Sequence, residues 1–157
     1  MNVAFSVTSG AAFAVATTAK TLLYLKAGST NPAVISAFGI SFDGVTASAV
    51  PALVEMCSST GATAGTAGSI GTVKMIKGYP SYTPISTATG QYSAEPGTLT
   101  SIAQWHVPAF MGSMVIQWPL GREPTLQITS ATDMLAVSFR VSAPAAVNAV
   151  AYIIWEE

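Results

Sequence analysis

The sequence is poor in charged residues. Six Lys and Arg and seven Asp and Glu make up 8% of its 157 residues, whereas a typical soluble domain has about 25%. The formal net charge is −1, and the six cations are scattered along the chain. Binding to nucleic acid or to an anionic membrane surface needs clustered Lys and Arg. The sequence therefore predicts neither of these partners.

Cysteine and histidine occur once each. The single Cys57 excludes an intrachain disulfide framework and a cysteine-based zinc site, and its strand-like surroundings, "ALVEMCSS", predict a small buried residue. His106 could serve a Ser-His-Asp triad, but no G-x-S-x-G motif accompanies it. We therefore expect a structural histidine in a strand.

Other catalytic and ligand-binding patterns are also missing. The seven acids are far apart, without calcium-loop spacing and with no pair favoured for glycoside hydrolysis. The glycine-rich stretch "GATAGTAGSIG" lacks the lysine of a phosphate-binding loop. The sequence therefore predicts no enzyme activity, no metal and no cofactor.

Long apolar runs are absent, although the mean hydropathy is +0.51. Ser, Thr, Gly or Pro interrupts every candidate before the roughly 18 residues of a transmembrane helix. The N-terminal stretch "MNVAFSVTSGAAF" has no basic region before its apolar part, so it does not resemble a secretory signal. Synthesis in a cytoplasm is the default expectation.

Strand patterns are abundant. In "DMLAVSFRVSA", Leu135, Val137, Phe139 and Val141 share one face, the period-2 pattern of a half-buried strand. Similar segments separated by Gly, Pro, Asn and Asp predict a single all-β domain over 1–157, an antiparallel sandwich of jelly-roll type. We expect eight or nine regular strands among eleven segments: 2–7, 20–27, 33–43, 49–58, 72–78, 85–93, 98–110, 112–118, 124–130, 133–142 and 147–155.

Three segments have unusual patterns. Residues 58–72 are rich in Gly, Ala, Ser and Thr and predict a long exposed loop. Residues 1–19 fit either an extended arm or an edge strand. The final segment, "VNAVAYIIWEE", is apolar on both faces, so we expect it to be covered twice, inside a sandwich or at a subunit interface.

A surface with so little charge is easily desolvated, which favours contact with neighbouring subunits. The alternative is a weakly soluble monomer with a polar Ser and Thr coat. Within residues 77–93, three tyrosines either contact a partner or pack on their own domain: Tyr79, Tyr82 and Tyr92. Arg122 and Glu123 are adjacent opposite charges. They either form a defined ion-pair contact, within the subunit or across an interface, or lie in a solvated turn.

The stretches "HVPAF", "WPLGREPTLQI" and "LAVSFRVSAPAAVNAVAYIIWEE" resemble small jelly-roll proteins encoded among the head genes of tailed bacteriophages. The resemblance covers roughly the last third of the chain. It implies a capsid decoration, or cement, protein that lies on the virion surface as a homotrimer and binds the major capsid protein. It implies no catalytic residues. It also implies that the N-terminal segment is an arm reaching a neighbour through Asn2, Val3 and Phe5.

Two other functions fit a jelly roll of this kind. One is a carbohydrate-binding or receptor-binding module of a phage tail, which would need exposed aromatic side chains beside convergent polar groups. The other is a minor structural protein of the tail or neck.

Overall fold

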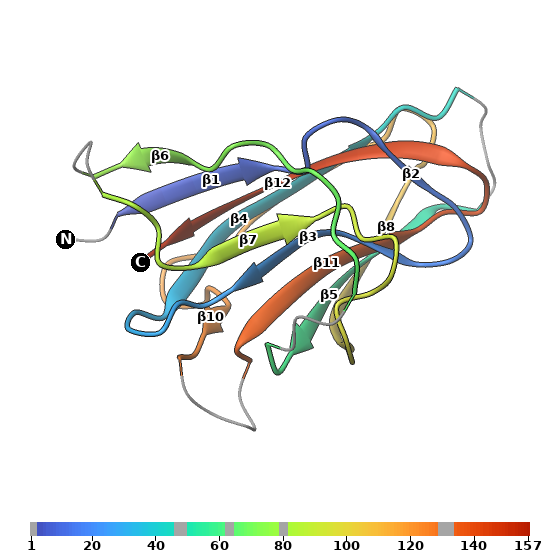
Figure 1. The fold of residues 1–157 in the computed structure, drawn as a ribbon. Coiled ribbons are helices and arrows are strands. Elements are labelled where there is room, and N and C mark those ends of the chain that lie inside the picture. The colour runs from blue at the N-terminus through green and yellow to red at the C-terminus, as the bar shows by residue number, and fades with distance from the viewer. Residues whose placement is uncertain (1–2, 46–49, 62–64, 79–81, 129–133) are drawn as a thin grey trace.

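The computed structural model describes residues 3–45, 50–61, 65–78, 82–128 and 134–157. These residues form two antiparallel sheets packed face to face, and they contain strands and connections but no helix (Figure 1). The all-β sandwich expected from the sequence is confirmed.

The first sheet contains seven strands and the second contains five. Each of the eleven expected segments overlaps one of them. The additional strand, β2, has only three residues between stretches of small residues, and it is ordered by pairing with β12. The first sheet consists of β1 (Ala4–Thr8), β2 (Phe13–Val15), β4 (Ala33–Phe42), β6 (Lys74–Lys77), β9 (Ser113–Gln117), β10 (Thr125–Leu126) and β12 (Val147–Glu156). The second consists of β3 (Lys20–Lys26), β5 (Ala52–Ser59), β7 (Thr87–Gly90), β8 (Thr100–Val107) and β11 (Ala136–Ser142).

The strand order is that of a jelly roll. In the first sheet β12, the last strand, lies between β1 and β4, and β9 follows β4. In the second sheet β11 lies between β3 and β5, and β8 follows β5. The last two strands thus return to pair beside the first ones, once in each sheet, which is the Greek-key arrangement of a jelly roll.

The connection between β5 and β8, residues 60–99, adds a strand to each sheet on the opposite side of the sandwich. There β6 pairs with β1 and β7 pairs with β3. The expected loop over 58–72 begins two residues later, because residues 58 and 59 belong to β5. Residues 60–61 and 65–72 lie outside the strands. Hydrogen bonds join Gly68 N to Gly90 O and Gly71 N to Thr8 O, so this segment is fixed against β7 and β1.

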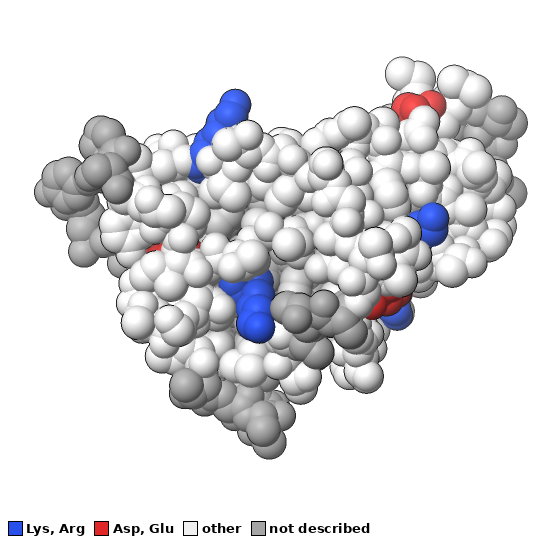
Figure 2. Space-filling model, viewed as in Figure 1, with Lys and Arg blue, Asp and Glu red and all other residues white. Residues whose placement is uncertain are grey.

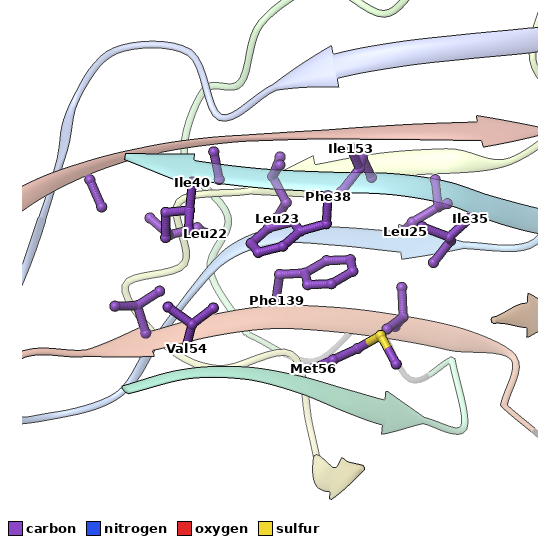
Figure 3. Close-up of a cluster of buried hydrophobic side chains, with 14 of the residues drawn as sticks. Leu22, Leu23, Leu25, Ile35, Phe38, Ile40, Val54, Met56, Phe139 and Ile153 are labelled. Carbon is purple, nitrogen blue, oxygen red and sulfur yellow. The ribbon is translucent and has the colours of Figure 1, made fainter. Parts of the chain in front are cut away.

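The core lies between the sheets, where Phe38 and Phe139 stack with ring centroids 4.1 Å apart (Figure 3). Leu22 and Leu23 are consecutive, yet both are buried in this core. The pairing of β3 with β11 shifts register at this point, so Leu22 is an extra residue in its strand. Such a bulge allows two neighbouring side chains to face the core.

The final strand is covered fully on one face only. Its inner residues, among them Ile153 and Trp155, are buried, while its outer residues are half-buried. On the outer face the ring of Tyr152 lies against Gly39 of β4, and a Cβ at Gly39 would collide with it. We expected both faces of this strand to be buried; within the described residues the outer face is only partly buried.

Candidate interaction surface

The described residues contain no group of three or more His, Cys, Asp or Glu side chains that could hold a metal ion. No helix among them is long and apolar enough to cross a membrane. Cys57 is fully buried, as expected, and burial raises the pKa of its thiol to about 11. His106 lies in strand β8, also as expected.

The best-connected charged pair lies on the second sheet. Arg140 Nε donates to Glu55 Oε2 at 2.6 Å, and Gln104 Nε2 donates to Glu55 Oε1 at 2.7 Å. Burial would raise the pKa of Glu55, but hydrogen bonds from Arg140, Gln104 and Ser101 outweigh it and hold the pKa below its usual range. Because these residues belong to β5, β8 and β11, the carboxylate joins three neighbouring strands.

Three other carboxylates bind main-chain groups of the same chain. Glu95 accepts a hydrogen bond from Thr21 N, and Asp43 accepts one from Asn148 N. Glu157 accepts hydrogen bonds from Ile85 N and Ser86 N, both 2.9 Å long, and from the ring nitrogen of Trp155. These acids fix strands and loops inside one subunit. Figure 2 shows how few charged atoms remain on one face of the molecule.

The predicted arm is not an arm within the described residues. Val3 and Phe5 are buried, and β1 pairs with β12 on one side and β6 on the other. Phe5 packs against Trp155, with ring centroids 5.6 Å apart. The assignment of these two side chains to a neighbour was wrong because their apolar character serves the chain's own core. Asn2 lies outside the described residues.

The tyrosines of residues 77–93 that are described pack on their own domain. The Tyr82 ring lies 6.0 Å from that of Phe5. Tyr92 is buried, meets Tyr24 edge to face and shares a 2.8 Å hydrogen bond between its hydroxyl and Thr89 Oγ1. Both residues therefore follow the second of the two alternatives. Tyr79 lies outside the described residues.

Arg122 and Glu123 follow a tight turn. Arg122 N donates to Pro119 O at 2.9 Å, and Gly121 has a φ of 83°, as a type II turn requires at its third position. The Arg122 side chain is exposed, and the salt bridge within the described part of the chain joins other residues, Arg140 and Glu55. The interface role of Arg122 and Glu123 stays a prediction.

A larger uncharged surface, which the sequence did not predict, lies at the outer strands β8 and β9 of the two sheets. Residues 96–121 contain no Asp, Glu, Lys or Arg, and they include both β8 and β9. We call these two strands and the connection 108–112 between them the β8–β9 side. Large apolar side chains are exposed on it and just beyond it: Ile102, Phe110, Met111, Val115 and Leu120.

Both strands of the β8–β9 side are sheet edges. Among the described residues, β8 pairs only with β5, and β9 pairs only with β4. Natural edge strands are normally protected by charge, proline or cover, because their unpaired main-chain groups can bind another chain. Neither β8 nor β9 contains a proline or a formally charged residue. This combination marks the β8–β9 side as a candidate interaction surface.

A pocket of about 470 Å³ lies elsewhere, on the outer face of the second sheet. Tyr24, Tyr92, Thr87, Thr89 and Lys26 contribute to its lining. The two tyrosines are only 2% and 5% exposed, so their rings do not form the open platform on which a sugar ring stacks. The pocket offers hydroxyl groups and one ammonium group.

Comparison with known proteins adds no relative. No protein family, curated protein or solved structure matches this chain.

Proposed function

We propose that this protein is a structural virion subunit that binds the outer surface of a tailed-phage head and stabilises it. The observation that carries the proposal is the β8–β9 side, which joins two unprotected sheet edges to an uncharged, partly apolar surface. The jelly-roll order of the strands and the resemblance of the C-terminal third also support it. Jelly rolls occur in viral capsid proteins as well as in lectins.

The mechanism is stabilisation by mass action. A subunit that contacts two or more capsid proteins binds the assembled shell and not its separate parts, so binding shifts the equilibrium toward the shell. The major capsid protein is the proposed partner. The homotrimer implied by the resemblance stays a prediction.

The test is binding to DNA-free heads of tailed phages that lack a decoration protein. We expect the protein to sediment with the heads up to a fixed ratio, and to raise the temperature at which the shells disassemble in calorimetry. Unassembled capsid protein is the control and should not bind. Equal binding to unassembled capsid protein, or no binding to any head in the panel, would contradict the proposal.

The pocket on the second sheet favours one alternative, a carbohydrate-binding or receptor-binding module of a phage tail. Its threonines and tyrosines could hydrogen-bond a small polyhydroxylated ligand. A glycan array would reveal such binding, and a variant with Thr89→Val should weaken it because the Thr89 hydroxyl is lost. Because the tyrosine rings are buried, we place this function second. The remaining alternative, a minor tail or neck protein, would be distinguished from a head protein by locating the chain in the virion.

A further inference from the structure

The free edge of β9 presents a defined set of main-chain groups. Phe42 N donates to Gly112 O, and Trp118 N donates to Ser36 O. In an antiparallel pair, hydrogen-bonded residues alternate with residues whose N–H and C=O groups point away. The register of β9 with β4 therefore directs the main-chain groups of Ser113, Val115 and Gln117 toward the open edge.

The edge of β9 is complementary to itself. When a second copy of β9 pairs antiparallel with the first, the number of paired residues is largest if the two-fold axis passes through Val115, the central residue of the strand. Val115 then meets Val115 of the other copy, and Ser113 meets Gln117, so polar pairs with polar and apolar with apolar. This register provides about six main-chain hydrogen bonds, and cross-strand pairs of matched character stabilise a sheet.

Strand β6, an outer strand on the opposite side of the same sheet, does not offer this match. Strand β6 has four residues and carries Lys74 and Lys77 at its two ends. A two-fold contact there would bring lysines close to lysines, and like charges directly opposite one another are unfavourable. In contrast, no formal charge lies anywhere in residues 96–121. Every copy of the chain carries the same uncharged β9 edge, so a second copy is the partner that the structure itself supplies.

We propose that two copies of this chain pair through β9 about a two-fold axis at Val115, forming one continuous sheet across the dimer. Symmetric pairing of this kind is an isologous contact, which closes after two subunits. The dimer does not depend on the proposed virion function, because it forms between free subunits. It also differs from the homotrimer that the sequence resemblance predicts.

The first test is the mass of the protein in solution by sedimentation equilibrium, without any capsid. The wild-type chain should have twice its 16.0 kDa mass. The variant Val115→Lys places two ammonium groups opposite each other and should have the mass of one chain at the same concentration. The matched control is Ile76→Lys on β6, because Ile76 is 55% exposed and Val115 is 59% exposed. The control should remain a dimer.

The second test does not depend on a destabilising change. In the proposed register the two Val115 Cα atoms are about 5.5 Å apart, within the usual range for a disulfide. Val115→Cys should therefore form a covalent dimer rapidly under mild oxidation, visible on a non-reducing gel. The buried Cys57 gives a low background, and Ile76→Cys is the control that should cross-link slowly.

These measurements separate the possible outcomes. A dimer that Val115→Lys abolishes, together with selective cross-linking of Val115→Cys, supports the two-fold contact. A wild-type monomer, a wild-type trimer or equal cross-linking of the two cysteine variants overturns it. Because capsid binding is measured separately, either proposal can fail without the other.

Discussion

The outer strands on the two lateral sides of the sandwich differ in their charge and in how they are covered. On one side, the insertion between β5 and β8 extends both sheets, and the outer strand β6 begins at Lys74 and ends at Lys77. There the Glu157 carboxylate also accepts hydrogen bonds from the main chain of residues 85 and 86. On the other side, β8 and β9 carry neither formal charge nor an added strand in the described residues. We call the first the β6–β7 side.

This difference shows how to interpret a sequence with little charge. The low total indicates only that some surface is neutral. The positions of the charges relative to the sheet edges indicate which surface: the chain places lysines at one edge and leaves the opposite edges without any. Since an unprotected edge is a template for pairing, the β8–β9 side is where association is expected.

The hydrophobic core contains residues from both sheets, so a substitution in the core should have the largest effect on the free energy of unfolding. Phe139 is fully buried and stacks on Phe38 across the two sheets. We expect Phe139→Ala to lower the free energy of unfolding by about 3–5 kcal/mol, measured by urea denaturation in the Val115→Lys background, which is expected to be a monomer. A loss below 1 kcal/mol would contradict the packing described here. Ile76→Ala, at an exposed position, should change it by less than about 0.5 kcal/mol.

The second-largest effect concerns the Glu55 network, which links β8 to β5 and β11. Glu55→Gln removes the carboxylate that joins Arg140 and Gln104. We expect a loss of about 1–2 kcal/mol at pH 7, because hydrogen bonds to a charged group are stronger than those to a neutral one. The same denaturation measurement applies, with Glu123→Gln as a control outside this network. An unchanged stability would show that the Glu55 network is not stabilising.

The contribution of Glu55 should also depend on pH. Its pKa in the folded chain lies below the ordinary value, which is about 4.3 for an unfolded chain. Its stabilisation is therefore complete above that value and is lost as pH falls through the lower folded pKa. The difference in unfolding free energy between wild type and Glu55→Gln should shrink as the pH is lowered below about 4.3. A difference that grows on acidification would contradict the direction of the pKa shift.

The smallest effect should be confined to the β6–β7 side. Glu157→Gln leaves one side-chain oxygen to accept hydrogen bonds where the carboxylate uses two, from Ile85 N and Ser86 N. We expect a local loss of about 1 kcal/mol, seen as faster hydrogen exchange at the amides of Ile85 and Ser86. The amides of β9 should exchange at unchanged rates. Faster exchange throughout the chain would show that the two sides are not independent.

Much of the fold could be predicted from residue patterns. Alternation such as Val137, Phe139 and Val141 located the long strands, because each has one face in the core. The three-residue strand β2 was missed because its order depends on pairing with β12 and not on its own sequence.

The site was harder to predict than the strands. Val3 and Phe5 are apolar, which fits an arm as well as a core strand, and the tyrosines fit a contact loop as well as internal packing. Only the sheet order decides which strands are edges, and strand order comes from long-range pairing. The uncharged run from 96 to 121 was visible in the sequence, but its meaning depends on β8 and β9 being neighbouring edges.

The most direct test of the β8–β9 side is amide hydrogen exchange of the wild-type chain at increasing protein concentration. We predict that the amides of Ser113, Val115 and Gln117 become progressively protected as the concentration rises, while those of β6 do not change. Exchange at these three amides that is fast and independent of concentration would contradict the assignment of this edge as the association surface.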